Sequence, residues 1–439
     1  MALETLLYSL EGLLAFELVE LKESGYVVDD AENEIEKVLK TGAISEKDAK
    51  RVFDEVLQTL KKREDFRYEE PSNLEGIMEE SSFERPLSFS MSDTELYNRI
   101  HGGFAGRIVG CVLGKPVEGF ESDKIRSFLE ENGTYPLTDY FRVTNKELIR
   151  KYSLHPEGLK ENFFFNAAPR DDDIDFTILN LMLLEKYGRS FSNDDVGENW
   201  LENMPFYQVF TAERIAYRNL VNRMHPPRTA MYMNPYREWI GAQIRADIFG
   251  WTCPDNLNSA AKFAYTDAIL SHDRNGIYGE IFVATMLAST FTSSDIREIV
   301  NRGLNHVPKN SRLHEAISDV IKWYEMNLDW QETFKKIRGK YGHYFWVHVI
   351  NNAAIVTMAL LYSEGDFEKG IMLAVQSGWD ADCNGATVGS ILGTYLGYDR
   401  IPSKWVKPFN DKLLSYIPGH SVLKISDVAR RIFNVCVNR

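Results

Sequence analysis

The sequence predicts an all-α protein in which a large helical domain follows an N-terminal helical extension. After Asp93, nearly every apolar segment repeats with the 3.6-residue period of a helix, whereas alternating β-branched runs between hairpin turns are scarce. In two separate segments glycine also recurs at every fourth residue, which places these glycines on one face of a helix. Both observations favour a core built from packed helices.

Residues 1 to about 63 follow the pattern of two or three amphipathic helices, because leucines recur at helical spacing between residues 6 and 18 and apolar residues recur between 52 and 60. Residues 64–93 are rich in Glu, Ser and Pro and follow no sustained period, which predicts a linker or an extended strap. We therefore expect a helical extension and linker at residues 1–90 and the main domain at residues 91–439.

The two glycine series predict a pair of closely packed helices. Glycine inside a helix costs about 0.5–1 kcal/mol relative to alanine, so four in register need a compensating gain, which close approach of two backbones supplies. Both segments also contain polar or charged residues, which is typical of a soluble core rather than of a membrane span. The first series is Gly102, Gly106, Gly110 and Gly114, and the second is Gly385, Gly389, Gly393 and Gly397.

Composition excludes several classes of protein. The 50 Lys and Arg residues against 64 Asp and Glu residues give a formal charge of -14, which disfavours general binding to nucleic acid or to anionic membranes. The longest apolar runs, such as Asn352 to Leu361, are much shorter than the roughly 20 residues that span a bilayer, and the first residues lack a signal-peptide pattern. The 4 cysteines have no paired spacing. We expect a cytoplasmic protein without disulfides; the pattern indicates no oligomeric state.

Three consecutive aspartates, Asp171, Asp172 and Asp173, precede an apolar helical run that begins at Ile174. Carboxylates at a helix start are stabilised by free amides and by the helix dipole, so one interpretation is capping alone. A single aspartate would suffice for that role. Three adjacent carboxylates repel one another unless a cation intervenes, and a divalent cation is the usual partner of several hard oxygen ligands. At this point a metal site and a solvated acidic cap are equally supported.

A second pair, Asp380 and Asp382, lies between the apolar segment at 371–375 and the second glycine series, again at an expected helix start. Burying two carboxylates there is costly unless they are paired or bound to a metal. An EF-hand calcium loop is excluded, because residues 385–392 do not supply its further oxygen ligands or its final Glu. Since no matching set of histidines accompanies the clusters, magnesium or manganese is favoured over zinc, and two ions sharing carboxylates are expected.

Three segments in this order suggest a family. They are Gly110-Cys111-Val112-Leu113-Gly114-Lys115-Pro116-Val117-Glu118, Asp171-Asp172-Asp173 and Gly378-Trp379-Asp380-Ala381-Asp382-Cys383. With them the chain resembles the ADP-ribosylglycohydrolases, the group that contains the ADP-ribosyl-arginine hydrolases and the enzyme that reactivates dinitrogenase reductase. The likeness covers about Leu96 to Gly397 and leaves the first 90 residues outside.

The resemblance implies a compact, orthogonal multi-helix fold with a magnesium centre of two ions, for which manganese is an alternative. The first segment is similar to the family's Gly-Asp-Ala-Leu-Gly-x-Pro-x-Glu and places Glu118 on its functional glutamate. The second is similar to Thr-Asp-Asp and the third to Gly-Gly-Asp-x-Asp-Thr. The implied metal ligands are Asp171, Asp172, Asp173, Asp380, Asp382 and Cys383.

The chain departs from the family pattern at four places. Cys111 replaces an aspartate, Asp171 and Cys383 replace threonine ligands, and Trp239-Ile240-Gly241 stands where the family has a Gly-Asn-Gly loop near the phosphates. A cysteine is a poor magnesium ligand, so Cys383 is either a ligand or a bystander. The segment ending at His272 matches a family Thr-His pair near the bound nucleotide, although a lone histidine is equally well explained as part of the core. The residues expected to contact substrate are Glu118, His272, Gly378 and Trp379.

The resemblance further implies hydrolysis of the N-glycosidic bond that joins ADP-ribose to a protein side chain or a small acceptor, through an oxocarbenium-like transition state. The substrate is thus a small molecule or an ADP-ribosylated protein, with ions holding the ribose hydroxyls and a water. The catalytic candidates, which the sequence does not rank, are Glu118, Asp172, Asp173 and Asp380.

Two other interpretations are open. The bulky Trp239 in the phosphate-proximal loop is compatible with a hydrolase of another small riboside or sugar conjugate. A non-catalytic homologue, similar to some lens crystallins or acting as a binding protein, is the second. The retained glutamate and aspartates argue against this second interpretation.

Overall fold

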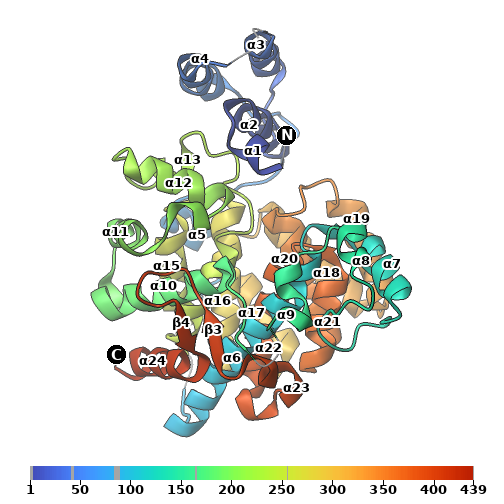
Figure 1. Ribbon diagram of the computed structural model, residues 1–439. Coiled ribbons are helices and arrows are strands. Elements are labelled where there is room, and N and C mark those ends of the chain that lie inside the picture. Colours follow the sequence, from blue (N-terminus) through green and yellow to red (C-terminus); the bar gives the residue numbers. More distant parts are fainter. Residues whose placement is uncertain (1–2, 41–43, 84–88, 164–165, 255, 439) are drawn as a thin grey trace.

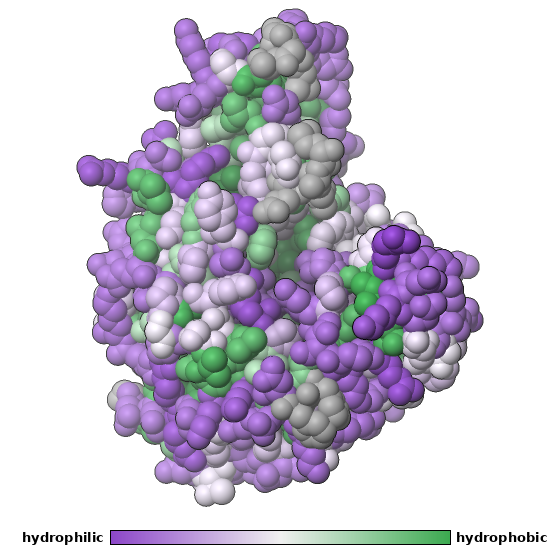
Figure 2. All heavy atoms as spheres, in the orientation of Figure 1, coloured by the Kyte–Doolittle hydropathy of each residue, from purple (hydrophilic) through white to green (hydrophobic). Residues whose placement is uncertain are grey.

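The computed structural model describes residues 3–40, 44–83, 89–163, 166–254 and 256–438, and the structural statements below concern these residues. The predicted all-α class is confirmed, because the described chain folds into helices with only two short two-stranded sheets. Figure 1 shows a large helical body from which the helices α1 to α4 project at one end. On the face drawn in Figure 2, hydrophilic residues predominate and apolar residues form separate patches. No helix in the described ranges is long and apolar enough to cross a bilayer.

Helices follow one another along the described chain, in agreement with the predicted all-α class. The extension and strap contain α1 (Leu3–Tyr8), α2 (Leu10–Glu23), α3 (Asp29–Leu39), α4 (Glu46–Arg51), a π-helix (Val52–Val56) and α5 (Leu74–Glu80). The first half of the main domain contains α6 (Asp93–Gly114), α7 (Ser122–Asn132), α8 (Glu147–Tyr152), α9 (Lys160–Phe163), α10 (Asp172–Tyr187), α11 (Asn193–Asn203), α12 (Thr211–Val221), α13 (Arg228–Met231), α14 (Asp247–Trp251) and α15 (Leu257–Ala268).

The second half of the main domain also consists mainly of α-helices. They are α16 (Asn275–Thr290), α17 (Ile296–Asn305), α18 (Arg312–Glu325), α19 (Trp330–Tyr341), α20 (Val349–Ser363), α21 (Phe367–Gln376), α22 (Ala381–Leu396), α23 (Ser403–Val406) and α24 (Ile425–Val437). The antiparallel strand pairs are β1 (Phe120–Glu121) with β2 (Gly378–Trp379), and β3 (Lys412–Leu414) with β4 (Val422–Lys424). Short 3-10 helices occupy Leu57–Thr59, Lys115–Val117, Pro156–Gly158, Gly188–Ser190, Phe206–Gln208, Gln243–Arg245, Tyr398–Arg400 and Lys407–Phe409.

Helices α6 and α22 pack against each other along their glycines near the centre of the body (Figure 1). A Cβ atom added to Gly110 would lie 1.8 Å from the carbonyl oxygen of Gly385, and one added to Gly106 would lie 2.1 Å from that of Gly389. Glycines that come later in α6 contact glycines that come earlier in α22, so the two helices run antiparallel. The predicted close approach of two backbones is confirmed, since only glycine leaves room for it.

The ends of this helix pair fix the position of the site. A Cβ atom on Gly114 would lie 2.2 Å from the carbonyl oxygen of Ala381, so the end of α6 lies beside the start of α22. The segment that follows α6 therefore meets the aspartates that begin α22. One detail of the glycine prediction was wrong: Gly397 is not part of the helical face but ends α22 with a φ of 83°, a conformation that favours glycine.

The N-terminal extension is attached to the main domain by buried ion pairs. Glu17 of α2 contacts Arg237 at 2.8 Å, and Glu20 contacts Arg274 at 2.5 Å. In the strap, Glu70 pairs with Arg312 at 2.7 Å. Movement of the extension would separate these pairs and leave buried charges without a partner. The contacts therefore hold the extension on the main domain.

The region predicted as a linker or strap packs on the main domain and also forms α5, which the sequence did not predict. Its residues 84–88 lie outside the described ranges. Likewise, the extension has more and shorter helices than the two or three expected. The domain boundary near residue 90 stays a prediction.

The close packing of α6 on α22 can be tested by adding one methyl group. We expect Gly110→Ala to destabilise the protein by about 1–3 kcal/mol or more, because the new Cβ atom overlaps a backbone carbonyl that cannot move alone. The matched control is Gly339→Ala in α19, where an added Cβ atom meets nothing within 4 Å and helix propensity should stabilise by up to about 1 kcal/mol. Urea denaturation followed by circular dichroism measures both. Equal stability of the two variants would contradict the packing.

Candidate metal centre

The first aspartate cluster begins α10. Asp171 adopts extended backbone angles as the N-cap and accepts a hydrogen bond from the Asp173 amide at 3.1 Å. The chain that leads into α10 is fixed by β3, because the Ala168 amide donates to the Lys412 carbonyl at 2.8 Å and the Leu414 amide donates to the Ala168 carbonyl at 3.0 Å. The cluster thus lies at a helix N-terminus with its approach held on a strand, as the sequence predicted for the helix start.

The second cluster begins α22 and is supported from two sides. Strand β2, which precedes it, pairs with β1, and the Gly119 amide donates to the Trp379 carbonyl at 2.9 Å. This ribbon connects the residue after Glu118 to the residue before Asp380. From α20, the Asn352 side-chain oxygen accepts hydrogen bonds from the Asp380 amide at 3.3 Å and from Asn384 at 2.7 Å. Both Glu118 and Asp380 are therefore held by backbone that cannot move independently.

Trp379 itself has a φ of 57°, a left-handed conformation that is strained for a bulky residue. Such strain persists only where the surrounding contacts enforce it, and it occurs most often at functional sites. Here the contacts of the β1–β2 ribbon enforce it immediately before the buried aspartates.

Two fixed side-chain cations form ion pairs with two of the three aspartates of the first cluster. Arg107, which is fully buried in α6, contacts Asp173 at 2.9 Å and Asp247 at 2.9 Å. Lys115, in the turn after α6, contacts Asp171 at 2.5 Å. Such fixed partners lower the cost of burying carboxylates.

The acidic groups perturb one another, which places them in one site. Burial and the charge of Asp171 raise the pKa of Asp172 to about 8, and the same two causes raise the pKa of Asp382 to about 6. Burial, then Asp382, raises the pKa of Glu118 well above its ordinary value. Asp171 is the exception. Burial acts to raise its pKa, but the Lys115 ammonium outweighs burial and lowers the pKa to about 2.

The donor set fits a divalent cation. The Oδ1 atoms of Asp380 and Asp382 are buried and have no hydrogen-bond partner among the described residues. A buried carboxylate oxygen without a partner is costly, and a hard cation satisfies it. Ligand atoms of Asp380, Asp382 and Cys383 lie within 4.8 Å of one another. A second such group contains Cys111, Asp171 and Asp173, also within 4.8 Å.

The structure brings the predicted acidic residues together from three distant segments. Glu118, Asp171 to Asp173, and Asp380 to Asp382 meet where α6, α10 and α22 end or begin. Sequence reasoning missed the fixed cations Arg107 and Lys115 and the supporting Asn352. A charged residue inside a glycine-rich apolar helix was a signal for Arg107, whereas no pattern in the sequence pairs Lys115 with Asp171.

Three of the residues predicted to contact substrate make contacts within the protein that account for the residue type at each position. His272 is 1% exposed; its Nε2 atom accepts from the Ala242 amide at 3.3 Å, and its Nδ1 atom lies 2.8 Å from the Ser271 hydroxyl. Burial lowers its pKa well below the ordinary value, so the ring is neutral. A Cβ atom on Gly378 would lie 2.3 Å from the Phe120 carbonyl, and the buried Trp379 indole donates to Glu121 at 3.2 Å. Substrate contact by these three residues stays a prediction.

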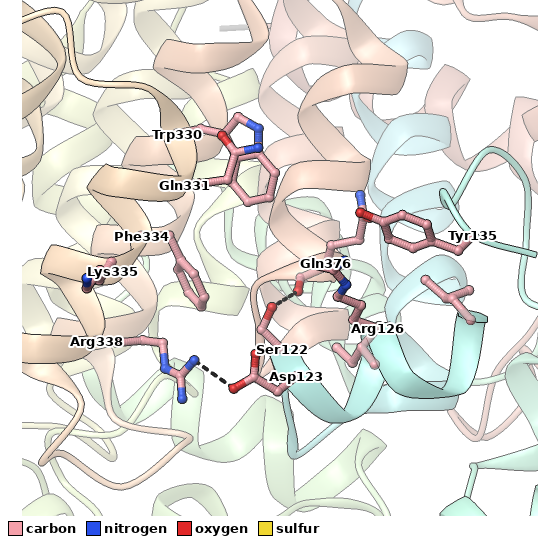
Figure 3. A pocket seen from close by; sticks show the side chains of 12 residues that line it. Ser122, Asp123, Arg126, Tyr135, Trp330, Gln331, Phe334, Lys335, Arg338 and Gln376 are labelled. Atoms are coloured by element: carbon pink, nitrogen blue, oxygen red, sulfur yellow. Dashed lines mark hydrogen bonds and ion pairs between the residues drawn. The ribbon is translucent and has the colours of Figure 1, made fainter. Parts of the chain in front are cut away.

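A groove of about 340 Å³ lies between α7 and α19 (Figure 3). Its walls include Tyr135, Trp330 and Phe334, and the ion pair between Asp123 and Arg338 bridges its two sides at 3.1 Å. None of the predicted site residues lines this groove. The acidic centre is therefore defined by its side chains rather than by this surface groove.

Comparison with known proteins adds a family to this geometry. A profile of the family described as ADP-ribosylglycohydrolase matches residues 92–439. The chain is 23% identical over 316 residues to an uncharacterized protein of Archaeoglobus fulgidus, a match that covers 70% of this chain and 90% of that protein. A solved structure described as an ADP-ribosylglycohydrolase-related protein complex is similar to 78% of this chain and 100% of its own, with 19% identity and a TM-score of 0.49.

The crowding of carboxylates can be tested through stability. In buffer with a chelator, we expect Asp382→Asn to melt at or above the temperature of the native protein, because the change removes a buried charge that Asp171 and Asp380 repel. Magnesium at 100 times its dissociation constant should stabilise the native protein by about 2.7 kcal/mol and the variant far less. The charge-matched control is Asp65→Asn, whose side chain is 79% exposed and should respond like the native protein. A variant that melts several degrees lower in chelator, with no magnesium effect on the native protein, would refute the interpretation.

Proposed function

The chain belongs to the ADP-ribosylglycohydrolase family, and we propose on this premise that it is a magnesium-dependent hydrolase of ADP-ribose conjugates. The bond cleaved is the N-glycosidic bond between the ribose C1 carbon and a protein side chain or small acceptor. The observation that carries the proposal is the pair of buried, unpartnered oxygens of Asp380 and Asp382 at the start of α22. Glu118 and the α10 aspartates accompany them.

The residues that would hold the cation are Asp380 and Asp382, with Asp172 and Asp173 contributing from α10. Their hard oxygens suit Mg²⁺, with Mn²⁺ as the alternative. When bound, such an ion lowers the pKa of a water and orients ribose hydroxyls. Cys383 is a poor ligand for Mg²⁺, and we treat it as a neighbour of the centre rather than as a ligand.

Several side chains of the centre have properties that suit hydrolysis. Asp172 lies at the start of α10 with a partly exposed side chain, so water can reach its carboxylate, which is our candidate for accepting the proton of a nucleophilic water. Burial raises the pKa of Glu118, which favours a protonated carboxyl group that donates a hydrogen bond to the sugar or the leaving group. The remaining carboxylates create a negative field, which stabilises the positive charge that develops on the ribose.

A specific observation favours a second candidate, hydrolysis of a smaller riboside. Trp239 stacks on Phe345 with ring centroids 5.1 Å apart, and Phe16 of the extension packs edge-on against Trp239 at 5.6 Å. The segment predicted to lie near the phosphates is therefore covered by aromatic side chains. A substrate without a diphosphate would not need that segment.

The cytoplasmic location expected from the sequence stays a prediction.

The metal-binding part of the proposal predicts a loss of affinity. We expect Asp380→Ala combined with Asp382→Ala to abolish magnesium binding in isothermal titration calorimetry, because the buried unpartnered oxygens are removed. The control variant Asp123→Ala removes an aspartate that is 81% exposed and should bind like the native protein. Unchanged binding in the double variant would exclude the α22 aspartates as ligands.

The catalytic part predicts release of a sugar. Native protein with magnesium should release ADP-ribose from ADP-ribosylated arginine or ADP-ribosylated serine, as measured by liquid chromatography and mass spectrometry. Glu118→Gln should lower kcat by about 10²-fold or more, the usual contribution of a proton donor. Release of ribose from simple ribonucleosides alone would favour the second candidate. Failure with every substrate, in protein that binds magnesium, would argue against hydrolysis of ribosides.

A further inference from the structure

The two halves of the acidic centre differ in the cations that the chain itself supplies. On the α10 side, Asp173 contacts the Arg107 guanidinium at 2.9 Å and Asp171 contacts the Lys115 ammonium at 2.5 Å. On the α22 side, the ion pairs of the described residues give no cation to Asp380 or Asp382, and one oxygen of each has no hydrogen-bond partner. Among the described residues, the α10 side thus has an ion pair for two of its three aspartates, whereas neither aspartate of the α22 side has one. A cation that binds there relieves the largest electrostatic cost, because a buried charge without a partner is unfavourable.

Lys115 lies inside the centre rather than at its edge. Its side chain is 13% exposed, and its ammonium also acts on Glu118, Asp172 and Asp382 electrostatically. Its other carboxylate neighbour, Glu157, is 3.9 Å away and mostly exposed, so the short contact to Asp171 is the dominant one. The ammonium thus occupies the position of a fixed cation among the carboxylates.

Asp171 has little capacity left for a metal ion. Its Oδ1 atom accepts the Asp173 amide at 3.1 Å as the cap of α10, and its Oδ2 atom contacts Lys115. A divalent ion at Asp171 would lie close to the Lys115 ammonium and would be repelled by it, because both cations would be held by the same carboxylate. Arg107 similarly engages an oxygen of Asp173. The thiol of Cys111, the remaining member of this group, is a poor ligand for a hard cation.

We propose that this chain binds one divalent ion, at Asp380 and Asp382, and that the Lys115 ammonium takes the place of a second ion at Asp171. The inference rests on the proposed metal-dependent function and replaces the expectation of two ions. An ammonium supplies one fixed charge and three donors, but it does not ionise a bound water as a divalent cation does. Lys115 is therefore a positioning residue that holds Asp171 and balances charge, while the single ion serves the chemistry.

The ion count of the full-length protein tests this directly. Protein saturated with Mn²⁺ and freed of excess metal by gel filtration is analysed by inductively coupled plasma mass spectrometry. One ion per chain is expected for the native protein. Lys115→Met, which frees Asp171, should bind two. The control is Lys186→Met, a surface lysine that is paired with Glu202 at 2.8 Å, and it should bind one. Lys115→Arg keeps the charge and should also bind one.

Electron paramagnetic resonance of the same samples gives a second measurement. An uncoupled six-line Mn²⁺ spectrum is expected for the native protein, and an exchange-coupled spectrum is expected for Lys115→Met. Two ions in the native protein, or one ion in a folded Lys115→Met variant, would overturn the inference while leaving metal dependence intact. Zero ions in the native protein would overturn the inference together with the proposed function. If Lys115→Met does not fold, the native count and spectrum still decide.

Discussion

The antiparallel contact between the glycine faces of α6 and α22 is the constraint on which the site depends. Backbone oxygens of one helix occupy the space where side chains of the other would be, at Gly106, Gly110 and their partners. This contact sets the end of α6 beside the start of α22, so that Glu118 and Asp380 meet although they are far apart in sequence. Because the contact leaves no room for a Cβ atom, the relative position of the two helix ends is fixed with little freedom.

Electrostatics adds a second constraint, because the fold must bury many carboxylates at once. Arg107, from the same glycine-rich helix, compensates Asp173 and Asp247 inside the core. Lys115 compensates Asp171. These two cations leave Asp172 and the two α22 aspartates without an ion pair, and this remaining acidity makes the centre suited to a metal ion.

The helical class, the glycine faces and the acidic residues could be predicted from sequence, because each depends on local periodicity or on motifs of adjacent residues. The packing of α6 on α22 followed from the spacing of their glycines. By contrast, the pairing of Lys115 with Asp171 depends on how three segments meet in space, which no local pattern encodes. The buried contacts of His272 and the ion pair between Glu17 and Arg237 are tertiary for the same reason. Helix α5 in the strap was not predicted, because a helix of 7 residues is too short to show a clear period.

The family profile begins at residue 92, so it does not include the extension, whose α2 helix places Phe16 against the aromatic pair of Trp239 and Phe345. The most direct measurement is a crystal structure of the full-length protein grown with Mn²⁺ and ADP-ribose, in which anomalous scattering identifies the metal. An anomalous peak in contact with Asp380 and Asp382, with a ribose beside Glu118, is the predicted result. No anomalous peak between the two aspartate clusters, or ADP-ribose bound elsewhere on the surface, would contradict the assignment of this centre as the active site.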